Sequence, residues 1–291
     1  SKDDGSFSFA KEPYGTWIIR EIESPKGYVL SEEEIAVTIG KVDEVVEIEL
    51  VNYFIKGNIA LTKVDEDYPD NKLSGAVFEV YSDTNGDGKL DKDDTLLGEM
   101  KELDGGVYQM SELRYGKYLV KETKAPTGFV LDENVYSVSV EENGKTYTVE
   151  NKAGVGFINA AQKGSLKIVK TSSDGKVEGF SFRVTGVDYD QTFKTDKNGE
   201  IVIEGLRIGD YTVSEVSDKA SAGYILPADK QATVKVDATA IVQMHNEFRD
   251  TPKTGDDFNL GLWVSLAALS VVGAGVLGFV GYKNRKKKKE D

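Results

Sequence analysis

The sequence contains no cysteine and a single histidine, His245. The absence of cysteine excludes disulfide bonds, thiolate catalysis and zinc sites built on cysteine pairs. The sequence also contains no Ser/His/Asp arrangement and no phosphate-binding loop. We therefore expect these residues to form no enzyme and to need no cofactor for their function.

Acidic residues outnumber basic residues, 50 to 36, and the excess is larger outside the C-terminal tail. The formal net charge is -14 and the pI is about 4.7, although a Lys/Arg-rich run closes the chain. Nucleic-acid binding needs a basic face. We expect no nucleic-acid partner.

Long hydrophobic runs are also missing, except for one at residues 258–282. Its central part, 260–280, has no charged residue and is long enough as a helix to cross a hydrocarbon core of ~30 Å. The basic tail 283–291 follows it, so the positive-inside rule places the tail in the cytoplasm and the preceding chain outside. The sequence predicts one C-terminal transmembrane helix.

A short motif precedes this run, formed by Thr251, Pro252, Lys253, Thr254 and Gly255. The motif, the apolar run and the basic tail, in that order, resemble the cell-wall sorting signal of Gram-positive surface proteins, whose usual pentapeptide is LPxTG. Thr251 stands where that signal has Leu. The resemblance implies a sortase partner that cuts after Thr254 and joins it to peptidoglycan. The alternative is an ordinary single-pass anchor with a polar linker.

No export signal stands at the N-terminus, which is polar. A chain placed outside the cell needs such a signal. We interpret the sequence as the C-terminal part of a longer, secreted polypeptide.

One block of residues occurs three times without gaps, at 14–21, 115–122 and 208–215. Each copy is a Gly turn followed by alternating residues and a glutamate, and each precedes a Gly-aromatic pair, at Tyr28, Phe129 and Tyr224. Period-2 patterns between Gly, Asn, Asp and Pro turns predict antiparallel β-sandwiches. The clearest other runs are 58–64, 76–81, 135–140, 146–149, 166–169, 180–184, 201–203 and 232–236.

The repeats divide the chain into four parts. Unit one (1–57) is an incomplete sandwich, because nothing in it corresponds to the first strand of the other copies. Unit two (58–163) and unit three (164–250) are complete, and 251–291 is the sorting signal. The fold class is therefore all-β, with tandem Ig-like sandwiches before one membrane helix.

Three polar residues recur at equivalent places in the units. Alternation puts a lysine on the apolar face of each first strand, Lys63 and Lys170, and buried charges of this kind need partners. The repeated glutamates are Glu21, Glu122 and Glu215, and the asparagines near the unit ends are Asn52, Asn159 and Asn246. We expect the asparagines in the last strand of each unit.

These motifs resemble the collagen-binding B-type, or prealbumin-like (SpaA-like), domains of Gram-positive surface proteins and pilins. The resemblance implies intramolecular isopeptide bonds from Lys63 to Asn159 and from Lys170 to Asn246, assisted by Glu122 and Glu215. Glu21 has the same place in unit one, where the lysine strand is missing. Asn151 also ends a strand and is an alternative partner in unit two. A buried Lys–Glu ion pair without a bond is the other interpretation.

A second motif lies in unit two, between a strand and its neighbour. Residues 83–94 fit the loop pattern of EF-hands, in which alternating oxygens wrap a hard cation and Gly88 allows a sharp turn. The sequence predicts a calcium loop here, with an acidic hairpin insertion as the alternative. The candidate ligands are Asp83, Asn85, Asp87, Lys89 through its backbone carbonyl, Asp91 and Asp94.

Together these features predict a wall-attached extracellular stalk that presents an N-terminal adhesive region. One alternative is that the domains themselves bind a host protein or glycan, which requires an exposed aromatic patch. Another is a pilin subunit, but residues 68–70 carry Asp where a linking lysine would stand.

Overall fold

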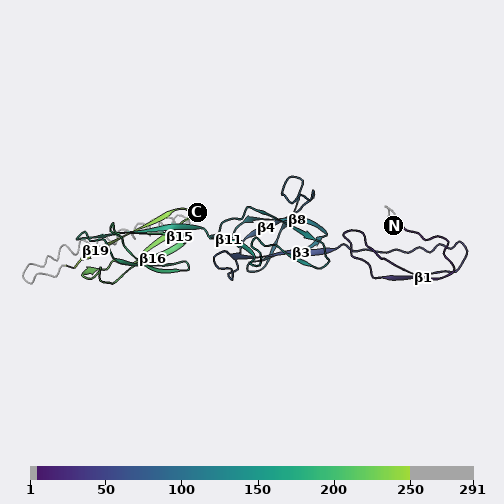
Figure 1. The fold of residues 1–291 in the computed structure, drawn as a ribbon, viewed down its shortest axis with the longest axis horizontal. Coiled ribbons are helices and arrows are strands. Elements are labelled where there is room, and N and C mark those ends of the chain that lie inside the picture. Colours follow the sequence, from purple (N-terminus) through teal and green to yellow (C-terminus); the bar gives the residue numbers. More distant parts are fainter. Residues whose placement is uncertain (1–4, 250–291) are drawn as a thin grey trace, which may run out of the picture.

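The computed structural model describes residues 5–249, which form three units in a row along an elongated molecule (Figure 1). Within these residues every regular element is a strand. The all-β prediction is confirmed for this part of the chain. No helix long and apolar enough to span a membrane is found in residues 5–249, and the predicted helix at 258–282 lies outside them.

Unit one contains a single antiparallel hairpin in its described residues. β1 (Gly15–Arg20) pairs with β2 (Glu34–Ile39). None of residues 5–55 is fully buried, and Trp17 and Ile18 of β1 are exposed. Side chains on both faces of this hairpin are therefore exposed.

Unit two is a sandwich of two sheets. One sheet has the order β10-β3-β7-β6, with β11 also paired to β3, and the other has the order β5-β4-β8-β9. Its strands are β3 (Lys56–Asp65), β4 (Val77–Ser82), β5 (Thr95–Glu99), β6 (Lys101–Asp104), β7 (Val107–Arg114), β8 (Gly116–Lys124), β9 (Val135–Val140), β10 (Thr146–Thr148) and β11 (Phe157–Asn159).

Unit three repeats this arrangement with an uninterrupted last strand. Its sheets have the orders β15-β12-β19-β17 and β14-β13-β16-β18. The strands are β12 (Lys163–Ser172), β13 (Ser181–Gly186), β14 (Tyr189–Lys194), β15 (Glu200–Arg207), β16 (Gly209–Val216), β17 (Tyr224–Ile225), β18 (Lys230–Val234) and β19 (Thr239–Phe248). β3 and β12 begin one or two residues before the predicted unit starts.

Each complete unit has its own core between its two sheets. Phe78 and Tyr108 are fully buried in unit two, and Phe182 and Tyr211 are fully buried in unit three. Alternating burial along β3 and β12 follows from the period of two residues in a strand. Units two and three therefore each have a hydrophobic core of their own.

The glycine that opens each repeated block has the same unusual backbone. Gly15, Gly116 and Gly209 have φ values of 146°, 158° and 144°, a region that residues with a side chain rarely adopt. A Cβ at Gly209 would lie 2.5 Å from Val187 Cγ2. The repeat seen in the sequence is thus a repeat of backbone geometry.

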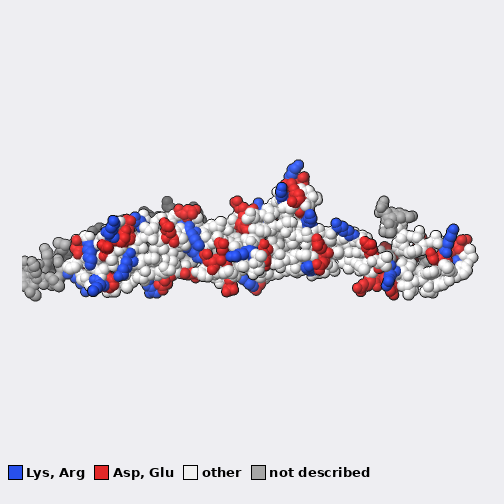
Figure 2. All heavy atoms as spheres, in the orientation of Figure 1, with Lys and Arg blue, Asp and Glu red and all other residues white. Residues whose placement is uncertain are grey.

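Charged side chains of both signs are interspersed along the molecule. On the face in view, Figure 2 shows acidic and basic groups side by side in all three units, without an extended basic surface.

Candidate functional site

The first strand of each complete unit carries its lysine into the core. Lys63 of β3 is 0% exposed and Lys170 of β12 is 1% exposed. The ammonium of Lys63 lies 4.9 Å from the ring centroid of Phe157, and that of Lys170 lies 4.2 Å from that of Phe180. The predicted burial of both lysines is confirmed. The aromatic partners were not predicted, although Phe157 precedes Asn159 by two residues.

The asparagine of each unit lies on the strand next to the lysine. β11 runs parallel to β3 with Phe157 opposite Lys63, and β19 runs parallel to β12 with Met244 opposite Lys170. Each asparagine is two residues further along, so Lys and Asn lie on the same face of neighbouring strands. The register is identical in the two units.

In unit two the glutamate reaches this pair from the opposite sheet, on β8. Glu122 is fully buried, and Asn159 Nδ2 donates hydrogen bonds to its two oxygens at 3.0 and 2.9 Å. Lys63 Nζ lies 3.7 Å from Glu122 Oε1 and donates to the carbonyl of Phe157 at 3.2 Å. The backbone N–H of Asp132 donates to Glu122 Oε2 at 2.8 Å. The three predicted residues therefore meet in one buried cluster.

Unit three holds the same residues in a looser arrangement. Asn246 Nδ2 donates to Glu215 Oε1 at 2.6 Å. Lys170 Nζ donates to the carbonyl of Thr171, and among the ion pairs of the described residues none joins it to Glu215. The Lys170 side chain thus lies in the core beside its partners without direct contact to the carboxylate.

Burial shifts the two charged groups toward neutrality. Desolvation lowers the pKa of Lys63 to about 8, against the opposing attraction of Glu122, and desolvation raises the pKa of Glu122. Lys170 and Glu215 shift in the same directions, with lowered and raised pKa values and with burial as the main cause. In both clusters burial therefore moves the lysine toward the neutral amine and the glutamate toward the neutral acid.

Four buried oxygens in the described residues have no hydrogen-bond partner, and three of them belong to these clusters. They are Asn159 Oδ1, Asn246 Oδ1 and Glu215 Oε2. A buried acceptor without a donor is costly. After rotation of the amide, a protonated glutamate could donate a hydrogen bond to the asparagine Oδ1. An isopeptide reaction needs a donor to this oxygen, and the oxygen has no other partner.

Asn151, the alternative partner, lies elsewhere in unit two. Its side chain donates to Asp132 Oδ2 and to the carbonyl of Ile158, both at 2.8 Å. An excursion at residues 150–156 separates β10 from β11, and Phe157 resumes the pairing with β3. Asn159 therefore has the register position that Asn246 has in unit three.

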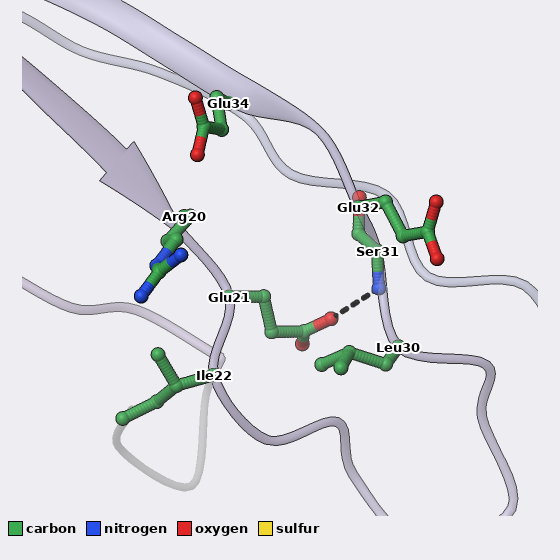
Figure 3. Close-up of a pocket in the computed structure, with 7 residues that line it drawn as sticks. All are labelled: Arg20, Glu21, Ile22, Leu30, Ser31, Glu32 and Glu34. Carbon is green, nitrogen blue, oxygen red and sulfur yellow. Dashed lines mark hydrogen bonds between the residues drawn. The ribbon is translucent and has the colours of Figure 1, made fainter.

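Unit one contains the glutamate–asparagine pair, and no lysine of its described residues forms an ion pair with Glu21. Asn52 Nδ2 donates to Glu21 Oε2 at 2.7 Å, and the N–H of Ser31 donates to the same oxygen at 2.8 Å. The carboxylate points toward Ser31 beside an open hollow of about 380 Å³ (Figure 3). Asn52 lies outside any strand, so the prediction that it belongs to a last strand of unit one is wrong. In the other units the last strand pairs with the first, and residues 5–55 include no such first strand.

The acidic loop 83–94 closes on itself through its side chains. Asp94 accepts from the N–H of Thr84 at 3.1 Å, Asp87 accepts from the N–H of Lys89 at 2.8 Å, and Asp83 Oδ2 accepts from the N–H of Gly88 at 3.1 Å. Asp83 is nearly buried, and its Oδ1 has no partner. However, no group of three or more His, Cys, Asp or Glu side chains in residues 5–249 is arranged to hold a metal ion.

The predicted sorting residues, Thr251 to Gly255, lie outside the described residues.

Comparison with known proteins places this chain in a family. The SpaA prealbumin-like fold domain matches residues 1–53, 57–153 and 164–248. The match in unit two ends inside the excursion that precedes β11. No curated protein matches.

Several solved structures are similar. The Bacillus anthracis TIE protein is 26% identical with a TM-score of 0.65, over 85% of this chain and 44% of that protein. The minor pilin GBS52 of Streptococcus agalactiae is 18% identical with a TM-score of 0.31, over 69% of this chain and 100% of that one. The pilus adhesin SpaC of Lactobacillus rhamnosus GG is 14% identical with a TM-score of 0.41, over 68% and 32%. The chain thus spans less than half of the Bacillus anthracis protein. On the family match, which covers most of its length, this chain belongs to the SpaA family of prealbumin-like fold domains.

Proposed function

We propose that this chain is an extracellular stalk whose complete units are each stiffened by a Lys–Asn isopeptide bond. The proposed bonds are Lys63 to Asn159 and Lys170 to Asn246. The observation that carries the proposal is that two units of different sequence bury the same Lys, Glu and Asn in the same register. A cross-link between neighbouring first and last strands would have the role that a disulfide has in a chain with cysteines.

The bond would form by displacement of ammonia. Glu122, with its raised pKa, takes the proton of Lys63, and the neutral Nζ attacks Cγ of Asn159. The protonated acid donates to Oδ1 as negative charge develops there, and then passes the proton to Nδ2. The Cγ–Nδ2 bond breaks and ammonia leaves. Glu122 takes the second proton of Nζ, so the new amide carries one N–H and Glu122 ends protonated. Burial holds the reacting groups together and excludes water.

Each cluster reacts once, so the chain is not an enzyme in the usual sense and requires no cofactor. The product removes the buried ammonium, whose desolvation is unfavourable in the unreacted fold. The reaction therefore stabilises the unit both by the cross-link and by the loss of a buried charge.

Intact mass under denaturing conditions tests this proposal. The full chain should be lighter than its sequence by two ammonia molecules, and Lys63→Ala and Lys170→Ala should each restore one. Asn159→Ala should also restore one, whereas Asn151→Ala should leave both deficits in place. An unshifted mass in the parent chain would contradict the proposal and leave buried ion pairs in its place.

We further propose that a sortase joins Thr254 to peptidoglycan, so that the stalk is attached to a Gram-positive cell wall after a membrane-spanning stage. The support is the sequence order of motif, apolar run and basic tail at 251–291. Thr254→Ala should move the protein from the wall fraction to the membrane fraction. Retention in the wall fraction would contradict the sorting proposal without affecting the isopeptide proposal.

A stalk is favoured over a domain that binds a host protein or glycan through aromatic side chains. In units two and three the exposed aromatic residues of the described chain are Tyr68 and Phe248. Tyr68 lies against Arg207, and Phe248 packs edge-on against Tyr224. Both rings are engaged within the molecule, so units two and three offer no free aromatic patch. The other exposed aromatic residues of the described chain lie in unit one, at Phe7, Phe9, Tyr14, Trp17, Tyr53 and Phe54.

A further inference from the structure

The joint between units two and three is built around one arginine. Arg207, at the end of β15, donates to both oxygens of Asp65 at 2.6 and 2.8 Å and to Asp67 at 2.9 Å. Its guanidinium lies 4.9 Å from the ring centroid of Tyr68 and 5.9 Å from that of Phe129. All four partners belong to unit two. A planar guanidinium that forms a fork to a carboxylate and stacks on rings has a fixed orientation.

These contacts are shielded from water. Asp65 has 3% and Arg207 15% of its side chain exposed, so the pair differs from ordinary surface ion pairs. Lys163 adds a second cation 3.4 Å from Asp67. Although burial acts to raise it, the pKa of Asp65 is lowered, mainly by the hydrogen bonds from Arg207. The carboxylate therefore stays charged over a wide pH range.

The joint between units one and two shares part of this plan. Arg114 precedes the block glycine as Arg207 does, and its guanidinium lies 4.0 Å from the ring centroid of Phe54 in unit one. The backbone contacts also match: Tyr115 donates to Ile55, and Ile55 donates to Gly27. At the second joint the corresponding donors are Ile208 and Gln162, and the acceptors are Gln162 and Gly128. The two joints therefore share the arginine–ring contact and the backbone hydrogen bonds, and in the described residues the carboxylate partners are present only at Arg207.

The far end of unit three lacks this acceptor. Asp174 lies four residues after Lys170, just beyond β12, as Asp67 lies four residues after Lys63, just beyond β3. Asp174 accepts a hydrogen bond from the hydroxyl of Tyr224 at 2.6 Å. The equivalent ring in unit two is Phe129, which has no hydroxyl, so Asp67 is available to Arg207. Ser172 replaces Asp65. In the described chain, the two free carboxylates that bind the arginine, those of Asp65 and Asp67, are thus present at the end of unit two and not at the end of unit three.

We infer that Arg207 fixes the orientation of unit three on unit two, making the two units one stiff body. We call the contacts of Arg207 with Asp65 and Asp67 the clamp. The clamp acts at the end of β3 and does not depend on a covalent bond within either unit. Domains joined by a plain linker move relative to each other by default. In this chain Arg207, Asp65 and Asp67 remove that freedom.

A distance measurement across the joint tests this inference. Because the chain has no cysteine, spin labels can be placed on Lys101→Cys in β6 and Lys230→Cys in β18, both exposed. Pulsed dipolar spectroscopy on the full chain should give one narrow distribution. Arg207→Ala should broaden it roughly twofold, since the units then move as linked domains. Arg207→Lys keeps the charge but loses the fork and should give an intermediate width.

Arg183→Ala is the matched control, because Arg183 forms a similar bidentate pair with Asp190 within unit three at 2.7 and 2.6 Å. It should leave the distribution unchanged. The double variant Asp65→Asn, Asp67→Asn removes the clamp from the other side and should reproduce the broadening, which covers the case that Arg207→Ala does not fold. An unchanged narrow distribution in a folded clamp variant would overturn the inference.

Discussion

Units one and two contain the same carboxylate–amide pair in different surroundings. Asn52 donates to Glu21 as Asn159 donates to Glu122, and in each unit one backbone N–H, of Ser31 or Asp132, binds the carboxylate. Only unit two has a first strand beside the pair. The pair in unit one is half-buried, whereas that in unit two is inaccessible to water.

The difference shows which part of the sequence builds which part of the site. The repeated block and the turn after it are sufficient to bring Glu and Asn together. The first strand supplies the lysine, closes the core and converts the segment with the asparagine into a paired strand. Burial, and with it the pKa shifts that make chemistry possible, depends on this strand.

The largest effect should come from removing the glutamate in each setting. Glu122→Ala removes the base and leaves Lys63 buried without a counter-charge, so the free energy of unfolding of unit two should fall by roughly 3–5 kcal/mol. Glu21→Ala removes only two hydrogen bonds at a half-exposed place and should cost about 1 kcal/mol. Urea unfolding of the two variants measures both. Equal losses would contradict the distinction between the units.

A pH titration sharpens the comparison for the lysine. In an Asn159→Ala chain the amine of Lys63 stays free, with its pKa lowered to about 8 from 10.5. Between these values the unfolded chain binds a proton that the fold does not, so stability should rise with pH, by at most about 3 kcal/mol.

The control for this titration is the double variant Asn159→Ala, Lys63→Met, which lacks the titrating group. Its free energy of unfolding should not rise with pH over this range. A rise of equal size in the double variant would assign the effect to other groups. The parent chain should also lack it if the amine is consumed in a bond.

The smallest expected effect is stabilisation by calcium. It should appear in unit two, which contains the loop 83–94, and not in unit three. We propose that the loop binds calcium, supported by its ligand pattern and by the unpartnered, nearly buried Asp83 Oδ1. Calcium at about ten times its dissociation constant would stabilise unit two by about 1.4 kcal/mol, and a lower calcium concentration would stabilise it less. Asp83→Asn should abolish the gain, and unit three should not respond. Unfolding curves that are identical with calcium and with chelator would contradict calcium binding and favour the alternative, an acidic hairpin insertion.

Much of the architecture follows from the sequence, because alternation over short runs determines which side chains face the core. It predicted the inward lysines, whereas the meeting of Glu122 with Asn159 was implied by the resemblance to prealbumin-like domains. It could not predict that residues 150–156 leave the sheet and return, since pairing with a distant strand decides this. The joint was missed for the same reason: Arg207 precedes a turn, where a charged residue is ordinarily solvated, and its partners are more than a hundred residues away.

The most direct test is to sequence the branched peptides of the proteolysed full chain. The account predicts one peptide pair joined through Lys63 and Asn159 and another through Lys170 and Asn246, each lighter by one ammonia, with Asn52 unmodified. Linear peptides carrying free Lys63 and Lys170 would contradict it.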